Sequence, residues 1–225
     1  MVVLLTSAVI ACSSNTVTPP QAKSTLVATT PTTTVVTVHS GTLLYKADWS
    51  HGSAGWQTAS GWKIEQGQLV TESDAPVTIP IPYTPTTPNY AVELRARIVR
   101  LLHRDGGYVS IVTQPTATKD GYQAGLSDLK GTEPRPNGSH GQAQAFLNPV
   151  SSTLEGTGRP IDYEPHFNWH TYRVEVKDNE VTLFIDGTSV SFADSTRTDM
   201  LSNGPIILGS AMIELHISSL SITAL

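Results

Sequence analysis

The clearest pattern of hydrophobic and polar positions lies in residues 169–187, which read WHTYRVEVKDNEVTLFIDG. Val174 and Val176 alternate with charged residues, and after Asp178-Asn179 a second run repeats the same two-residue spacing. Side chains of a strand point alternately to its two faces, and Asx-rich breaks favour tight turns. The pattern therefore predicts two antiparallel strands that share one buried face.

Short alternating runs of this kind recur from residue 41 to the end, separated by Gly, Pro, Asn and Asp, with no long helical period. In residues 91–98, Glu93, Arg95 and Arg97 are expected to point outward from apolar neighbours. Many short strands at this spacing predict an all-β protein, a two-sheet antiparallel β-sandwich or jelly roll. The predicted strands are 43–47, 62–64, 68–71, 76–81, 90–99, 107–113, 122–126, 143–147, 171–177, 181–185, 189–192, 205–210 and 212–223.

The chain is expected to have three parts: residues 1–12, 13–40 and 41–225. Residues 1–12 form an apolar run shorter than the roughly 20 residues of a membrane-spanning helix, which suits a signal peptide. Their end, Val9-Ile10-Ala11-Cys12, resembles the bacterial lipobox, which implies that Cys12 is cleaved and lipidated. No Lys or Arg precedes the run, so we expect the true start to lie upstream.

The second part, residues 13–40, is rich in Thr, Ser, Pro and Val and carries almost no charge. Such a composition favours extended conformations without a packed core. We expect it to be a tether between a lipid anchor and the folded domain.

The charge balance argues against a nucleic-acid partner. Fourteen Lys and Arg against nineteen Asp and Glu give a net charge of −5, so no basic field attracts a phosphate backbone, and we expect no nucleic-acid partner. The single Cys excludes an intrachain disulfide.

Several motifs of the third part are similar to those of the concanavalin A-like lectin and glucanase superfamily. They are the start at residues 48–50 (DWS) and 61–69 (GWKIEQGQL), the strand at 90–98 and the closing hairpin at 169–187. This superfamily includes laminin G-like modules, family 16 glycoside hydrolases and 3-keto-disaccharide hydrolase-like domains. The resemblance implies a concanavalin A-like sandwich with saccharide ligands, but its motifs describe strands and turns, not a reaction.

Catalytic residues are not evident. A family 16 glucanase would place two carboxylates on one strand face, and no such pair is present. The nearest candidates are Asp162 and Glu164, but loop carboxylates followed by a proline are more often surface charges. His166 and His170 have a helical spacing but lie in an expected loop, so a metal site there is not favoured. The fold often holds calcium, and Asp48, Asp105, Asp120 and Asp128 are the candidates considered for it.

A sugar site combines aromatic rings with amide, carboxylate or guanidinium groups. Residues 113–166 offer such a mixture, and the candidates chosen from it are Tyr122, Asp128, Arg135, Gln142, Gln144 and Tyr163. The alternative is that Tyr122 and Phe146 belong to the core. Trp49, Trp56, Trp62 and Trp169 fall in the fold motifs, and at least three of them are expected in the core.

Three functions remain open. The favoured one is a non-catalytic, monomeric lipoprotein that binds a polysaccharide or glycan at the outer face of the cell membrane. The second is a glycoside hydrolase-type enzyme related to 3-keto-disaccharide hydrolases or glucanases. The third is an adhesive cell-envelope domain with a protein partner, which would show an exposed apolar patch.

Overall fold

The computed structural model describes residues 39–53, 55–58, 61–103, 106–129, 138–149, 155–163 and 168–225, with only the backbone at 155–157. The expected signal peptide, Cys12 and nearly all of the expected tether lie outside these ranges. The described residues form two antiparallel sheets, which confirms the predicted sandwich. They contain strands and no helix, so none of them offers an apolar helix long enough to cross a membrane.

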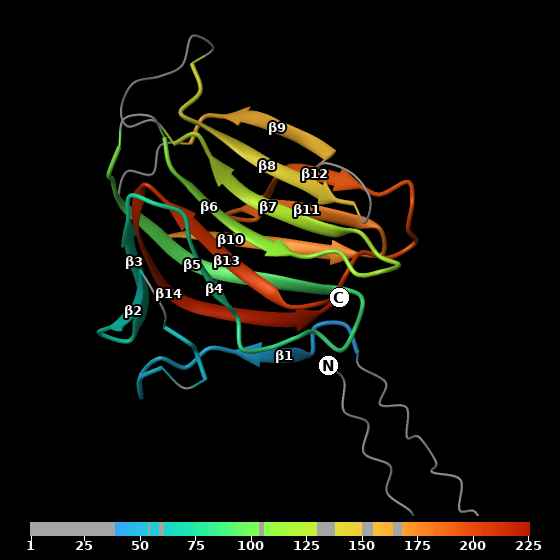
Figure 1. The fold of residues 1–225 in the computed structure, drawn as a ribbon, viewed down its shortest axis with the longest axis horizontal. Helices are drawn as coiled ribbons and strands as arrows, with labels where there is room; N and C mark the ends of the chain where they lie inside the picture. Colours follow the sequence, from blue (N-terminus) through green and yellow to red (C-terminus); the bar gives the residue numbers. More distant parts are fainter. Residues whose placement is uncertain are drawn as a thin grey trace, which may run out of the picture. The chain divides into compact units, whose positions relative to one another are not determined.

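The larger sheet has eight strands. They are β1 (Leu43–Lys46), β2 (Trp62–Glu65), β3 (Gln68–Ser73), β5 (Tyr90–Leu101), β10 (His170–Lys177), β11 (Glu180–Ile185), β12 (Thr188–Asp194) and β14 (Ile213–Ala224). Their order is β12-β11-β10-β5-β14-β3-β2, and β1 pairs with β14 beyond the end of β3. The long strands β5 and β14 lie side by side in this sheet (Figure 1).

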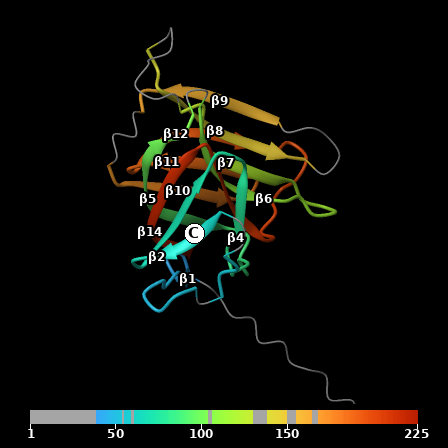
Figure 2. The ribbon, with the colours of Figure 1, turned by 60° about the vertical axis from the view of Figure 1, so that its left-hand side comes forward.

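The smaller sheet has six strands and covers one side of the larger one (Figures 1 and 2). They are β4 (Val77–Pro80), β6 (Tyr108–Thr113), β7 (Gly121–Ser127), β8 (Gly141–Asn148), β9 (Glu155–Ile161) and β13 (Ile206–Ala211), in the order β4-β13-β6-β7-β8-β9. Along one side of the sandwich, β12 of the larger sheet lies beside β8 and β9. The two sheets thus meet along that side.

The hairpin that the sequence predicted most clearly is β10–β11. Val174 pairs with Leu183 and Val176 with Val181, and all four are buried. The turn between the strands places Asp178 at φ 54°, a left-handed conformation that Asp tolerates better than most residues. The alternation of apolar and polar residues therefore predicted the buried face of this hairpin correctly.

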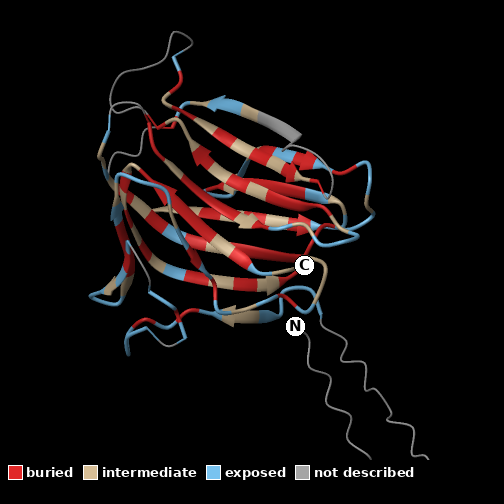
Figure 3. Cartoon of the chain, viewed as in Figure 1, coloured by how far each residue is buried: buried red, intermediate tan, exposed pale blue. Residues whose placement is uncertain are grey.

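The core lies between the two sheets, where buried and less buried positions alternate along the strands (Figure 3). On β5, Leu94 and Ile98 are each 1% exposed, as the alternation in residues 91–98 predicted. Trp49, Trp56 and Trp62 are buried, which confirms that at least three tryptophans belong to the core. The fourth tryptophan is only half-buried and lies just before β10.

Strand β9 was not expected, because its sequence EGTGRPI lacks an apolar alternation and contains two glycines and a proline. It is the outermost strand of the smaller sheet. An edge strand needs ladder hydrogen bonds on one side only, so Pro160 is tolerated there although it has no N–H. Strand β9 is therefore held in the sheet by its pairing with β8 and not by an apolar alternation of its own.

Candidate functional site

The outer face of the smaller sheet carries a cluster of amide side chains on β7 and β8. Inward positions on these strands are held by apolar residues such as Leu126 and Ala143, so their neighbours in sequence point outward. All of the outward side chains in this cluster are partly exposed. We name Gln123, Gln142, Gln144 and Asn148 the amide face.

Strand pairing arranges this face in rows that run across the sheet. Gly209, Ser110, Gly125 and Gln144 follow one another on β13, β6, β7 and β8, and Gly158 on β9 completes the row. Gln144 is the only long side chain of this row. It therefore stands next to last in a strip that is otherwise formed by glycines and one serine.

A second row borders this strip with larger side chains. It consists of Ile207, Val112, Gln123 and Phe146, again one from each successive strand. Phe146 is half-buried, so part of its ring is accessible. An amide beside an accessible aromatic ring is the combination that suits a saccharide.

Gly125 is required at its position in the strip. A Cβ atom there would lie 2.1 Å from the carbonyl oxygen of Val109 and 2.6 Å from Cα of Ser110. Gly121, at the start of the same strand, would bring a Cβ within 2.2 Å of the Thr113 carbonyl oxygen. The close approach of β6 to β7 thus excludes a side chain at both positions.

Neighbouring residues orient the amides. The Gln144 amide donates to the hydroxyl of Ser127, and Asn148 Nδ2 donates to Gln114 Oε1 at 3.3 Å. A primary amide carries two donor hydrogens and two acceptor lone pairs. Each of these bonds therefore leaves most of the hydrogen-bonding capacity for a ligand or water.

A histidine and a carboxylate pair at the end of the amide face. His140 precedes β8 and Asp162 follows β9, and His140 Nδ1 lies 3.0 Å from Asp162 Oδ1. The imidazole is 17% exposed, whereas the carboxylate is 87% exposed. A carboxylate that holds one ring nitrogen leaves the other available for proton transfer.

Asp162 also borders a pocket of ≈ 590 Å³ between the segment after β9 and the β11–β12 turn, which we call the end pocket. Inside it, His170 Nδ1 lies 2.7 Å from Asp186 Oδ2, and the backbone N–H of Thr171 donates to the other carboxylate oxygen at 2.8 Å. Burial opposes ionisation of Asp186, but these hydrogen bonds outweigh it and lower its pKa. The lining residues are Ile161, Asp162, Tyr163, His170, Ile185, Asp186, Thr188 and Val190.

The structure brings together some of the candidates chosen from sequence. Gln142 and Gln144 lie on the amide face, and Asp162 lies at its end. Asp128 is half-buried at the end of β7, against Gly106. Arg135 and Glu164 lie outside the described residues.

The two tyrosine candidates have other places. Tyr122 is 0% exposed in the core, with its hydroxyl 2.8 Å from that of Tyr90, so it cannot contact a ligand on the sheet surface. The expectation that Tyr122 contacts a sugar is therefore wrong, and its burial agrees with the alternative that it belongs to the core. Phe146, which the same alternative placed in the core, is half-buried on the outer face. Tyr163 is also buried; its hydroxyl is bonded to that of Tyr172, and burial raises its pKa to about 12.

His140 and Asn148 belong to the polar mixture of residues 113–166 but were not chosen as candidates, and Gln123 was not considered. The signal was present in part, since polar residues occupy three of the four outward positions of β8. The choice of strand face on β7 was wrong for Tyr122, because a tyrosine suits either a core or a surface position.

The carboxylates considered for calcium are dispersed. Asp48 accepts hydrogen bonds from the N–H and hydroxyl of Ser50, while the buried Asp120 accepts one from Ser195. Asp105 lies outside the described residues. Within the described ranges, no three His, Cys, Asp or Glu side chains gather in a group that could hold a metal ion.

One protein family matches most of the chain. Residues 45–218 match the family described as the 3-keto-alpha-glucoside-1,2-lyase-like domain. No curated protein sequence matches the chain.

Solved structures share the fold at low sequence identity. A carbohydrate-binding module from Bacillus subtilis has a TM-score of 0.54 at 13% identity, covering 76% of this chain and 96% of that one. A laminarinase from Flavobacterium sp. UMI-01 has a TM-score of 0.56 at 14% identity, covering 80% and 99%. The laminarinase catalytic domain of Thermotoga maritima MSB8 has a TM-score of 0.56 at 12% identity, covering 83% and 99%.

Proposed function

Since the chain belongs to the family of 3-keto-alpha-glucoside-1,2-lyase-like domains, we propose that it binds a saccharide and that the ligand lies on the amide face. The observation that carries the proposal is the group of amides on β7 and β8, two of which are oriented by neighbouring side chains, beside the accessible ring of Phe146 and a strip of glycines and one serine. Sugar hydroxyls need both donors and acceptors, which amides provide, and the apolar side of a sugar ring packs on an aromatic ring.

The geometry also favours the smaller sheet over the larger one as the neutral-saccharide face. The described outer face of the larger sheet is dominated by ion pairs between arginine, lysine and glutamate. Charged pairs are strongly hydrated and give a neutral polyol little advantage over water. The names of the similar structures, a carbohydrate-binding module and laminarinases, are in keeping with a saccharide ligand.

A binding measurement tests the proposal. A glycan and polysaccharide array, followed by calorimetry on the ligand found, is expected to show that Gln144→Ala weakens binding about tenfold, since losing one or two hydrogen bonds costs about 1–2 kcal/mol. Gln57→Ala, which removes an exposed amide elsewhere, is the matched control and should bind as the natural chain does. Equal affinities of the natural chain and Gln144→Ala would remove the amide face from the proposal.

A second candidate function is cleavage of the bound sugar, favoured by the His140–Asp162 pair at the end of the same face. In this reading the substrate carries a keto group at C3, and His140 takes the proton from C2 while Asp162 holds the imidazole ring. The electron pair left on C2 forms a C1–C2 double bond as the C1–O glycosidic bond breaks, and the leaving alcohol takes up a proton. The described chain shows no second carboxylate beside this pair, so acid–base work by histidine suits it better than a two-carboxylate mechanism. Incubation with 3-keto-glucosides, followed by analysis of the products, should show turnover that His140→Gln abolishes while binding persists; a pure binding module shows no turnover with either protein.

We also propose that the domain is held at the outer face of a membrane by a lipid on Cys12, with residues 13–40 as tether. The lipobox resemblance at residues 9–12 and the composition of the following segment support it. A tether would let an anchored saccharide-binding domain reach a polymer at the cell surface.

A further inference from the structure

Two arginines in the middle of the larger sheet have no carboxylate partner among the described residues. Arg95 and Arg97 lie two positions apart on β5 and both point to the outer face, where their Cα atoms are separated by about 6.6 Å. Arg95 is exposed, and Arg97 is half-buried. Their position in the centre of a sheet distinguishes them from arginines on loops.

Arg173, Arg100 and Lys63, three other cations on this face, are each paired with a glutamate. Arg173 contacts Glu93 at 3.3 Å and Glu175 at 2.7 Å. Thus the carboxylate nearest to Arg95 along β5, that of Glu93, is already engaged by another guanidinium.

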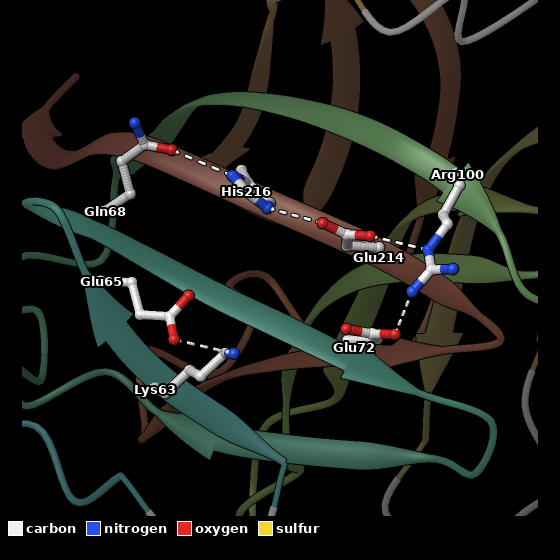
Figure 4. A network of polar contacts seen from close by, with 7 residues as sticks. All are labelled: Lys63, Glu65, Gln68, Glu72, Arg100, Glu214 and His216. Atoms are coloured by element: carbon white, nitrogen blue, oxygen red, sulfur yellow. Dashed lines mark hydrogen bonds and ion pairs between the residues drawn. The ribbon is translucent and has the colours of Figure 1, made fainter.

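The same holds between the end of β5 and strands β2, β3 and β14, as Figure 4 shows. Arg100 contacts Glu214 at 2.8 Å and also Glu72, while Lys63 contacts Glu65 at 2.8 Å. His216 Nε2 lies 3.0 Å from the other oxygen of Glu214. The ion pairs therefore leave Arg95 and Arg97 as unmatched positive charges on a chain whose net charge is −5.

Arg97 is in addition incompletely hydrogen-bonded. Its guanidinium carbon lies 4.9 Å from the ring centroid of Trp169, and its buried Nε has no hydrogen-bond partner among the described residues. A guanidinium that stacks on an aromatic ring keeps a fixed orientation, which presents its remaining N–H groups as a preformed fork. Such a group is ready to bind a planar oxyanion.

Strand pairing surrounds the two arginines with hydroxyl and aromatic groups. Thr171 on β10 and Ser219 on β14 pair with Arg95 from either side, and His216 on β14 pairs with Arg97. Ser219 is exposed at a bulge in β14. We define the arginine patch as Arg95, Arg97, Trp169, Thr171, His216 and Ser219.

We propose that the arginine patch is a second binding site, distinct from the amide face, and that it takes a carboxylate-bearing polysaccharide, a polyuronate. Guanidinium forks match carboxylates in two-point contacts, the hydroxyls suit the sugar hydroxyls, and two arginines on one strand can engage carboxylates of successive sugar units. The saccharide part rests on the proposed function, whereas the anion part rests on the unmatched arginines alone. The two sites lie on the outer faces of opposite sheets, so one domain could contact a neutral and an acidic polymer together.

The test measures binding of the full chain to polygalacturonate, with neutral dextran and dextran sulfate as comparison polymers. Arg95→Gln/Arg97→Gln is expected to weaken polygalacturonate binding at least tenfold at low salt. Lys46→Gln/Lys177→Gln removes the same two charges elsewhere and should retain it; Lys177 lies on the same face, six positions along β10 from Thr171. Arg95→Lys/Arg97→Lys, which keeps the charge and cannot form the fork, should also bind less tightly.

Each other result overturns the proposal. Equal weakening by both glutamine double variants would mean a net-charge effect, and unchanged binding in the arginine variants would exclude the patch. Binding of dextran sulfate without polygalacturonate would overturn the carboxylate assignment. The two proposals can fail independently of each other. Gln144→Ala tests the amide face and should leave the binding of polygalacturonate unchanged.

Discussion

Tyr122 stands in the core on β7 with its hydroxyl 2.8 Å from that of Tyr90. Burial raises the pKa of Tyr122 from 10.0 to about 12, because the folded protein solvates the phenolate poorly. The neutral form is thus favoured on folding. Its contribution to stability is complete below about pH 10 and is lost as pH rises through about 12.

We therefore expect the free energy of unfolding to fall by about 3 kcal/mol between pH 10 and pH 12 from this residue. Tyr122→Phe should cost about 1 kcal/mol at neutral pH, through the lost hydrogen bond, and should make this alkaline decline shallower. Urea unfolding at several pH values measures both effects. Tyr108→Phe, a change at a residue that is only half-buried, serves as control. A decline in Tyr122→Phe as steep as in the natural chain would contradict the assignment.

Among the elements, β7 depends most on glycine. Its Gly125 faces the backbone of β6 so closely that a methyl group would collide with two main-chain atoms, which cannot move as the end of a flexible side chain can. The glycine at this position therefore goes together with both the missing side chain in the strip and the close spacing of β6 and β7.

Gly125→Ala should lower the free energy of unfolding by about 3 kcal/mol, since the two strands must separate to accept the methyl group. Gly204→Ala is the matched change, because a Cβ there would meet only the hydroxyl of Ser202 at 3.2 Å. Thermal and urea unfolding of both variants provide the comparison. Equal stability of the two would show that β6 and β7 have more room than their backbones indicate.

At the scale of the whole molecule, the proposed anchor at Cys12 decides where the sandwich works. Expressed in a bacterium that processes lipoproteins, the chain preceded by a positively charged leader should incorporate an alkyne fatty acid and appear in the membrane fraction. Cys12→Ala should lose both the label and the membrane association, whereas Ser13→Ala should keep them. Labelling that persists in Cys12→Ala would refute the anchor.

The parts of the fold that were predictable are those in which each strand carries its own signal. The β10–β11 hairpin and the inward residues of β5 were read correctly, because side chains alternate with a period of two and turn residues mark the breaks. Strand β9 was not predicted, because its conformation depends on its pairing with β8 and not on its own sequence pattern. Tyr122 was misplaced because the period shows which residues share a face but not which face is buried.

Local alternation and hydrophobicity were enough to predict the fold class, the strand faces of the clearest segments and the burial of three tryptophans. Tertiary structure alone decided which residues from distant segments meet. Gln144 lies beside Gly125, His140 beside Asp162, and Arg97 beside Trp169 only because strands pair in a particular order and register. Register and strand order arise from the packing of the whole core, so no local stretch of sequence records them.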